Sequence, residues 1–441
     1  MVHTFTYKDE YFAVDVESGS VHMLDKDGHG AVAYLCEAER RGEDIKDAAK
    51  GKGEIYDEVM QLVDDGMLFS QPGDDLSRPK NVIKAACLHL AHDCNLRCDY
   101  CFAKGGAFAG KRELMSAETA MAAIDFIADI SGTRRNIEID FFGGEPLLNF
   151  DVLKQTVDYA RSIEAKKAKR FRFTVTTNAY RLTDEMKDYI DEHMDNVVVS
   201  LDGRPRVHDA VRKTASGGGS YGRVAENAKE MLLSRKGEYY VRGTFTTDNL
   251  DFSNDVLHVA DMGFKGVSIE PVVTTGERAL KEEHLDTIFS EYDALAEQYE
   301  ERRRQGKGFT FFHFMVDLDA GPCLQKRIRG CGAGTEYIAV APSGDIYPCH
   351  QFVGKSEYRM GSVYGGSLDT KLAGKFDECN IFNMKSCAAC WAKYYCSGGC
   401  AAANYNINGD IMNPYELGCK MQKKRLEIAI ALAAREQMEG I

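Results

Sequence analysis

Three features are missing from this sequence, and each absence argues against a class of protein. No apolar run approaches the roughly 20 residues that a helix needs to cross a bilayer, so we expect no membrane span. Residues 1–4 lack the basic and apolar regions of a signal peptide, so we expect a cytoplasmic protein. A basic surplus is also missing, because the formal net charge is -13, and this disfavours a nucleic-acid partner.

The length and the cysteine content narrow the class further. A chain of 441 residues is too long for one ordinary core and favours two to four domains. It contains 14 Cys, and a reducing cytosol keeps thiols free of disulfides. We therefore expect these thiols to bind metal.

Three cysteines lie close together behind the apolar run 85–90. Cys94, Cys98 and Cys101 are separated by three and two residues. A cuboidal iron-sulfur cluster normally takes four Cys thiolates, so three thiolates leave one iron free to bind a small molecule. The alternative is a zinc knuckle that uses His92, but zinc prefers four closed ligands.

This loop resembles the cluster-binding motif of the radical S-adenosylmethionine (SAM) enzymes. In that family the open iron binds the amino and carboxylate groups of SAM, and an electron from the cluster cleaves it to a 5′-deoxyadenosyl radical. The resemblance implies that Cys94, Cys98 and Cys101 hold a catalytic 4Fe-4S cluster. It also implies that Tyr100 and Phe102 contact the cofactor, and that the protein works at low oxygen.

Strand-like and helical segments alternate after residue 85. The helical segments are amphipathic, as in residues 117–130, which Ser116 precedes as a candidate N-cap. The strand-like runs are 86–90, 137–142, 171–177, 197–201, 241–246 and 266–270. Six such units predict an α/β fold with a parallel sheet and outer helices, which is the partial (β/α)6 barrel of the radical SAM type, over residues 85–310.

Polar residues follow the ends of these strands, where the ligands of parallel sheets bind. The resemblance assigns Gly143, Gly144 and Glu145 to the amino group of the cofactor. Further cofactor contacts are expected from Thr177, Asn178, Ser200, Asp202, Arg212 and Glu270. The alternatives are helix N-capping for Thr177 and Asp202, and a surface ion pair for Arg212.

The first 75 residues predict a separate module. Residues 11–24 alternate as a hairpin, and helical spacing follows around residues 31–35, 45–49 and 55–66. This pattern resembles the winged-helix, PqqD-like domain that binds leader peptides by adding them as a strand. A DNA-binding winged helix is the alternative, and the acidic balance argues against it. Residues 76–84 are the expected linker.

A second group of cysteines lies in residues 311–441 and resembles the SPASM domain, which carries two auxiliary 4Fe-4S clusters. The resemblance implies two ligand sets, which are Cys331, Cys349 and Cys400 for the first cluster, and Cys387, Cys390, Cys396 and Cys419 for the second. Cys323 is a candidate fourth ligand of the first cluster. Cys379 lies outside the pattern, Cys36 and Cys87 are expected in the core, and two zinc ribbons are the alternative.

Taken together, the run 140–150, the run 347–354 and the first module resemble the maturases of the Cys-rich SCIFF peptides. The resemblance implies that thioether cross-links form in a ribosomal peptide, whose leader binds residues 1–75, with a flavodoxin or ferredoxin as electron donor. His350 stands where sulfatase-maturing enzymes have an Asp, which weakens the interpretation as a peptide dehydrogenase. A carbon-carbon cross-linking enzyme and a non-enzymatic electron carrier or scaffold would also use clusters of this kind.

Overall fold

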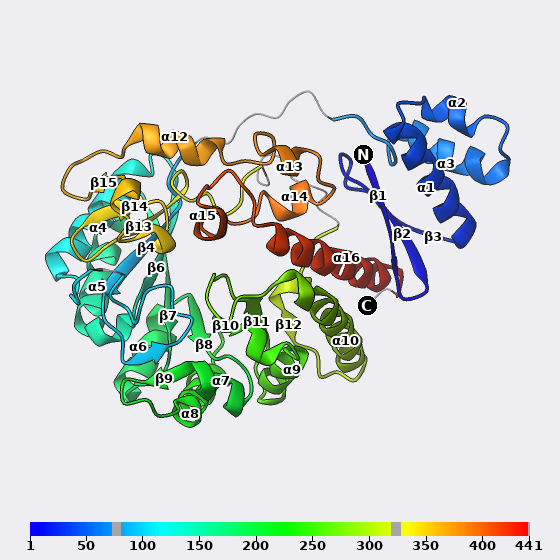
Figure 1. The fold of residues 1–441 in the computed structure, drawn as a ribbon. Helices are drawn as coiled ribbons and strands as arrows, with labels where there is room; N and C mark the ends of the chain where they lie inside the picture. Colours follow the sequence, from blue (N-terminus) through cyan, green and yellow to red (C-terminus); the bar gives the residue numbers. More distant parts are fainter. Residues whose placement is uncertain (73–80, 109, 319–327, 440–441) are drawn as a thin grey trace.

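The computed structural model describes residues 1–72, 81–108, 110–318 and 328–439. Three sheets form, and the largest has ten strands in the order β12-β11-β10-β8-β7-β6-β4-β13-β14-β15. Helices cover the outer face of this sheet, and a long C-terminal helix leads from it toward the N-terminal module (Figure 1).

The N-terminal module contains a three-stranded antiparallel sheet. The hairpin predicted over 11–24 corresponds to two of these strands, and the prediction missed the first strand. The strands of this sheet are β1 (Val2–Tyr7), β2 (Glu10–Asp15) and β3 (Val21–Leu24). Three helices follow, α1 (Lys26–Arg40), α2 (Ile45–Ala49) and α3 (Glu54–Asp64). The predicted helices are confirmed, and α1 begins because the carboxylate of Asp25 accepts a hydrogen bond from the amide of Gly28.

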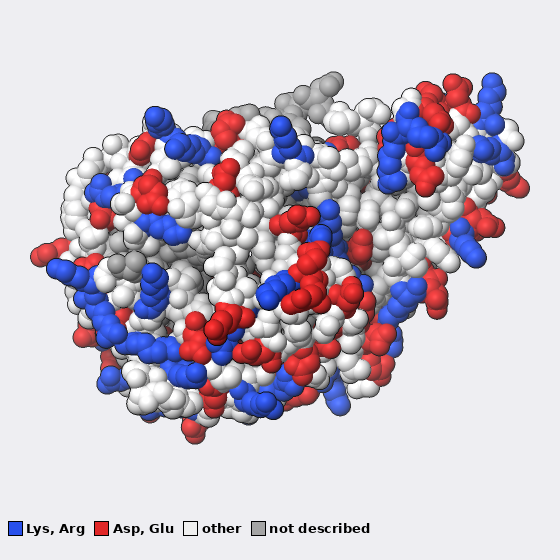
Figure 2. Space-filling model, viewed as in Figure 1, with Lys and Arg blue, Asp and Glu red and all other residues white. Residues whose placement is uncertain are grey.

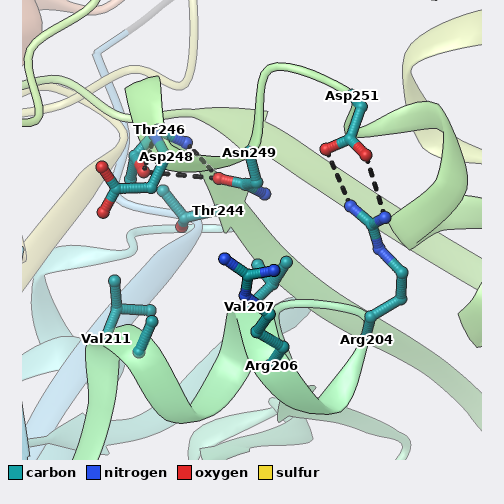
Figure 3. A pocket seen from close by; sticks show the side chains of 10 residues that line it. Arg204, Arg206, Val207, Val211, Thr244, Thr246, Asp248, Asn249 and Asp251 are labelled. Carbon is teal, nitrogen blue, oxygen red and sulfur yellow. Dashed lines mark hydrogen bonds and ion pairs between the residues drawn. The ribbon is translucent and has the colours of Figure 1, made fainter.

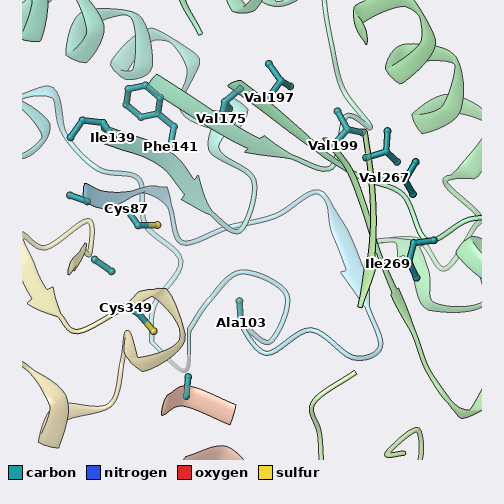
Figure 4. Packing of buried hydrophobic residues seen from close by; sticks show 14 of the residues in the cluster. Cys87, Ala103, Ile139, Phe141, Val175, Val197, Val199, Val267, Ile269 and Cys349 are labelled. Atoms are coloured by element: carbon teal, nitrogen blue, oxygen red, sulfur yellow. The ribbon is translucent and has the colours of Figure 1, made fainter. Parts of the chain in front are cut away.

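All six predicted runs are strands of one parallel sheet. They are β4 (Ala85–Ala91), β6 (Asn136–Gly143), β7 (Arg170–Thr177), β8 (Asn196–Ser200), β10 (Glu238–Phe245) and β11 (Gly266–Pro271). Alternate residues such as Ile139, Phe141 and Val175 are fully buried. Figure 4 shows part of this packing, in which one face of each strand contributes to the hydrophobic core.

Helices connect these strands and cover their apolar face. In chain order they are α4 (Ala117–Ile130), α5 (Phe150–Lys167), α6 (Asp184–His193), α7 (Pro205–Val211), α8 (Tyr221–Leu232), α9 (Ser253–Asp261) and α10 (Leu285–Arg304). The predicted α4 is confirmed with its cap, because the Ser116 side chain accepts from the amide of Thr119. Its buried residues Ala120, Ala123 and Ile127 recur at helical spacing and face the core.

The C-terminal region extends the barrel sheet. Strand β12 (Thr310–Phe311) pairs with β11 at one end, and β13 (Tyr337–Val340) pairs in parallel with β4 at the other. Strands β14 (Asp345–Tyr347) and β15 (Gly361–Ser362) add antiparallel pairs. The remaining helices are α12 (Thr370–Glu378), α13 (Lys385–Ala388), α14 (Lys393–Cys396), α15 (Ala401–Asn408) and α16 (Glu416–Glu439). The cysteine-rich region is therefore continuous with the barrel.

The N-terminal sheet packs against the C-terminal region. Glu17 is buried and accepts hydrogen bonds from Lys393 Nζ (2.6 Å) and from the Tyr394 hydroxyl (3.0 Å). The His3 ring stacks on Trp391, with centroids 3.9 Å apart. This module is thus fixed beside the segment that carries Cys387, Cys390 and Cys396.

Figure 2 shows acidic and basic side chains intermixed over this face, including the N-terminal helices. In the part of the chain that is described, every helix is too short or too polar to span a bilayer.

Candidate functional site

The three cysteines of the first group follow β4 and lie at the end of the barrel. The segment β5 (Leu96–Cys98) pairs antiparallel with β9 (Arg212–Thr214), and this pairing ties the loop to the chain that follows α7. Cys94, Cys98 and Cys101 are free thiols of intermediate exposure. All three line one cavity of about 260 Å³.

This cavity, here called the barrel pocket, collects most of the predicted cofactor contacts. From the predicted set it is lined by Cys94, Cys98, Tyr100, Cys101, Phe102, Gly143, Gly144, Thr177, Asn178, Ser200, Arg212 and Glu270. These residues come from the loop after β4, from the exits of β6, β7, β8 and β11, and from the start of β9 (Arg212–Thr214). Glu145 and Asp202 are buried beside it at 3% and 0% exposure.

The glycine pair brings the β6 exit against the cysteine loop. Gly143 has φ +130°, and a Cβ there would lie 2.3 Å from the carbonyl oxygen of Ala91. A Cβ on Gly144 would lie 2.2 Å from the carbonyl oxygen of Asp93. The amides of Gly144 and Glu145 donate to these two carbonyls at 2.8 and 2.9 Å. The absent side chains thus allow two backbones to touch, and the cysteine loop is held in place.

The carboxylate of Glu145 is held by the β7 exit. It accepts hydrogen bonds from the Thr177 hydroxyl (2.8 Å) and from the amides of Asn178 (2.8 Å) and Leu147 (3.1 Å). Burial nevertheless raises the pKa of Glu145 to about 7. A cationic amino group nearby would stabilise its ionised form, which is consistent with the predicted role of Glu145.

Asp202 connects three parts of the site. It accepts hydrogen bonds from the Tyr100 hydroxyl (2.6 Å), from Arg212 Nε (2.9 Å) and from the Thr244 amide (3.0 Å). Arg212 does form an ion pair, with Asp202, but its side chain is 11% exposed, so this pair lies in the interior and not at the surface. Its guanidinium lines the pocket while Asp202 fixes its direction.

The sequence did not identify Arg242, which faces the same pocket from β10. Its Nη2 lies 3.0 Å from Oε1 of Glu270 on the neighbouring strand. The Glu270 carboxylate is thus bound to Arg242, and a cofactor that contacts Glu270 would compete with Arg242 for this carboxylate. The alternation of Tyr240, Arg242 and Thr244 along β10 was the signal for an inward position.

The first three thiols fit a cationic cluster. Burial raises the pKa of Cys94 to about 12 and that of Cys98 to about 11, and neighbouring thiols add to both shifts. Bare thiolates of Cys94 and Cys98 would therefore be costly here, and a positively charged metal group offsets that cost. Among the described residues no three Cys, His, Asp or Glu side chains converge as they would on one metal ion. A cuboidal cluster binds each thiolate to a different iron and needs no such convergence.

The second cysteine group occupies a separate cavity beside the barrel. Cys331, Cys349 and Cys400 line it together, as the predicted first ligand set requires. Cys379 also lines it, although the sequence pattern leaves this residue out. Cys323 lies outside the described residues.

The predicted second ligand set also groups together. The thiols of Cys419, Cys387 and Cys390 all act electrostatically on Cys396. Cys36 and Cys87 are buried, in agreement with their expected place in the core. The cluster assignments themselves stay predictions.

His350 joins the two cysteine regions. It directly follows Cys349 and lines the barrel pocket, where its ring lies 4.9 Å from Phe142 and 5.6 Å from Phe102. Burial lowers its pKa to about 4, so the imidazole is neutral at pH 7. One wall of the barrel pocket is therefore adjacent to the first set of the second cysteine group.

A larger cavity of about 680 Å³ lies next to the barrel pocket (Figure 3). Its wall contains neither Cys nor His, and its Arg204 is paired with Asp251 and Asp255. It shares only Thr244 with the barrel pocket. We place the chemistry in the smaller cavity because the thiols lie there.

Comparison with known proteins agrees with this geometry. Residues 88–237 match the model of the Radical SAM superfamily. The radical SAM cyclopropyl synthase TigE of Paramaledivibacter caminithermalis is 23% identical over 359 residues, which cover 77% of this chain and 72% of that protein. The cysteine-type anaerobic sulfatase-maturating enzyme of Clostridium novyi is 22% identical over 334 residues, covering 70% and 85%.

Two solved structures are similar in fold. The structure of native anSMEcpe with bound AdoMet has a TM-score of 0.65 and 18% identity, and covers 80% of this chain and 99% of that chain. The structure of Streptococcus suis SuiB bound to precursor peptide SuiA has a TM-score of 0.54 and 15% identity, covering 93% and 97%. The predicted α/β partial barrel is thereby confirmed.

Proposed function

We propose that this protein, which carries a radical SAM domain and is related to peptide maturases, joins a Cys sulfur to a carbon atom within a Cys-rich ribosomal peptide. The radical SAM family implies SAM and a 4Fe-4S cluster. Two auxiliary clusters and a low-potential flavodoxin or ferredoxin complete the proposal. When bound, the cluster and SAM supply a radical able to remove hydrogen from a carbon that has no acidity for a base to exploit.

One observation carries the proposal. The barrel pocket is lined by Cys94, Cys98 and Cys101 and also by His350, which directly follows Cys349 in the sequence. A substrate residue bound in this pocket would therefore lie close both to the first thiol group and to the segment that carries Cys349. That position suits a reaction in which a carbon loses hydrogen on one side and a sulfur is held on the other.

The residues around the pocket have distinct tasks in this proposal. Cys94, Cys98 and Cys101 hold the cluster, while Glu145 and Arg212 bind the amino and carboxylate groups of SAM. Asp202 and Thr177 fix the directions of these two charged groups. Phe102 and Phe142 contribute apolar surface to the pocket.

The N-terminal sheet provides a place for the leader. Among the described residues no strand pairs with the outer edge of β3, since the sheet order is β1-β2-β3. An extended peptide can add to this edge through backbone hydrogen bonds. The residues 1–75 module would then hold the precursor while its Cys-rich part reaches the pocket.

The test is the mass and thiol count of a Cys-rich precursor peptide after anaerobic incubation with SAM and reductant. Each thioether removes two hydrogen atoms and one alkylatable thiol. A loss of two hydrogens with every thiol still alkylatable contradicts the proposal. That result favours a carbon-carbon link or a dehydrogenation. Dehydrogenation is the second candidate because the chain is similar to a sulfatase-maturating enzyme.

A further inference from the structure

The barrel interior contains a carboxylate that the proposed function does not yet use. Asp140 lies on β6 between Ile139 and Phe141, which are both fully buried in the core. Successive side chains of a strand point to opposite faces, so Asp140 faces the interior of the barrel. Phe142, two residues further on, has the same orientation and lines the barrel pocket. Asp140 thus lies one step below the pocket.

A hydroxyl connects Asp140 to the pocket. The Thr176 hydroxyl lies 3.3 Å from Oδ1 of Asp140 and donates to it. Thr176 itself lines the barrel pocket, one strand away on β7. A group bound in the pocket can therefore exchange a proton with Asp140 through Thr176.

Asp140 has neighbours on other strands of the sheet. The register places it opposite Cys87 on β4 and Thr174 on β7. Asp140 acts electrostatically on Cys87 and Tyr337, and Arg242 acts on Asp140 from β10. Both Cys87 and Tyr337 are also influenced by Cys349, and Figure 4 shows Cys87 and Cys349 in the same part of the core. Asp140 thus lies below the barrel pocket and shares the neighbours Cys87 and Tyr337 with Cys349 of the second cysteine group.

We propose that Asp140 accepts the proton of the substrate Cys thiol through the Thr176 hydroxyl, an inference that rests on the proposed thioether formation. The S–H bond breaks and its electron pair stays on sulfur. The thiol proton goes to the Thr176 oxygen while the Thr176 proton goes to the Asp140 carboxylate. No electron is transferred in this step, and the charge moves from Asp140 to the substrate sulfur.

The electrostatics of Asp140 suit this task at neutral pH. Burial raises its pKa to about 7, against the opposing effects of the Thr176 hydrogen bond and the Arg242 charge. An acceptor with a pKa near the working pH is efficient, and an ordinary Cys has a pKa of about 8.5. Because the acceptor must be ionised, the rate of thioether formation should rise with pH through about 7.

The experiment compares Asp140→Asn with Glu138→Gln in the full, cluster-loaded protein. Glu138 is a matched control because it faces the same side of β6, two residues before Asp140, and is exposed. For Asp140→Asn we expect about 100-fold less thioether, a pH profile displaced toward the pKa of the free thiol, and unchanged release of 5′-deoxyadenosine. Glu138→Gln should behave as wild type. Infrared titration of the full chain should show carboxyl groups that ionise near pH 7, and Asp140→Asn should lose one of them while the signal of Glu145 stays.

The outcomes separate this inference from the proposed function. If wild type forms thioether and Asp140→Asn keeps its rate and pH profile, the inference is overturned and the proposed function stands. If wild type consumes SAM but leaves every thiol alkylatable, the proposed function fails and the role of Asp140 fails with it. If Asp140→Asn also stops the release of 5′-deoxyadenosine, Asp140 supports the cofactor site and the inference is overturned.

Discussion

The two cysteine groups of this chain are built in different ways. Residues 94–101 carry the first group on one loop, and backbone hydrogen bonds from the Gly144 region hold that loop in place. The second group draws its thiols from residues 331–419, which lie in loops, short helices and α16. A local motif can be recognised from spacing alone, whereas the second arrangement depends on the tertiary fold. The two groups should therefore respond differently to substitution.

The largest expected effect is the loss of the first group. Replacing Cys94, Cys98 and Cys101 together by Ala should abolish the release of 5′-deoxyadenosine, because no thiolates hold the cluster. Iron bound by the second group should persist, since its thiols line a separate cavity. Chromatography of the nucleoside products and an iron assay after anaerobic purification give both answers. Continued release of 5′-deoxyadenosine would refute the assignment of this loop.

The second group should show the opposite pattern. The double change Cys387→Ala and Cys390→Ala should lower the iron content and stop thioether formation, while uncoupled release of 5′-deoxyadenosine continues. The reason is that the barrel pocket keeps its own thiols and the Glu145 network. Cys36→Ala is the matched control, because Cys36 is a buried thiol of the N-terminal core. If the control loses as much iron as the double change, the iron loss reflects instability.

A smaller effect is expected where the peptide leader meets the N-terminal sheet, outside both cysteine groups. The amide of Asp15 donates to Ser20, and in an antiparallel pair this bonding alternates, so the amide of Met23 points to the open edge of β3. Met23→Pro should weaken leader binding about 10-fold by removing that donor. Met23→Ala, which keeps the amide, should bind nearly as wild type. Fluorescence anisotropy with a labelled leader measures both.

These two Met23 variants also test the separation between docking and chemistry. Release of 5′-deoxyadenosine without peptide should be the same in both and equal to wild type. A loss of leader binding in Met23→Ala as large as in Met23→Pro would mean that the side chain is recognised, and not the strand edge.

Sequence reasoning located the residues that act through local spacing. The six strands, α4 and the three-thiol loop were all predicted, because each leaves a periodic or motif signal within a few residues. Strand β1 was missed, although its pairing with β2 completes the N-terminal sheet. Residues 2–7 are rich in Val, Thr, Phe and Tyr, so a strand signal was present there and was overlooked.

The residues that sequence reasoning missed act across strands. Arg242 and Asp140 reach the barrel interior from two strands that are separated by β7 and β8 in the sheet. Arg242 belongs to no motif, and Asp140 was counted only as the first residue of the run 140–150, without a role of its own. Their proximity arises only when the sheet curves. Gly143 and Gly144 were predicted to contact the cofactor. In the structure, their missing Cβ atoms allow the backbone to pack against the carbonyl groups of Ala91 and Asp93. The sequence motif identified the two glycines, but their contacts with Ala91 and Asp93 are known only from the structure.

The smallest effect on activity is expected from the contact between the N-terminal module and the cysteine-rich region, where only the stability of the protein should change. Lys393→Met should leave the Glu17 carboxylate buried without its cation, which costs about 3–5 kcal/mol. Adding Glu17→Gln should recover much of this loss, because the uncompensated charge is removed while Tyr394 still has an acceptor. Thermal unfolding of the two variants measures the difference as a change in Tm. An equal loss in both variants would show that packing, rather than the ion pair, joins the module to the cysteine-rich region. Release of 5′-deoxyadenosine should match wild type in both, since the first group has no contact with this pair.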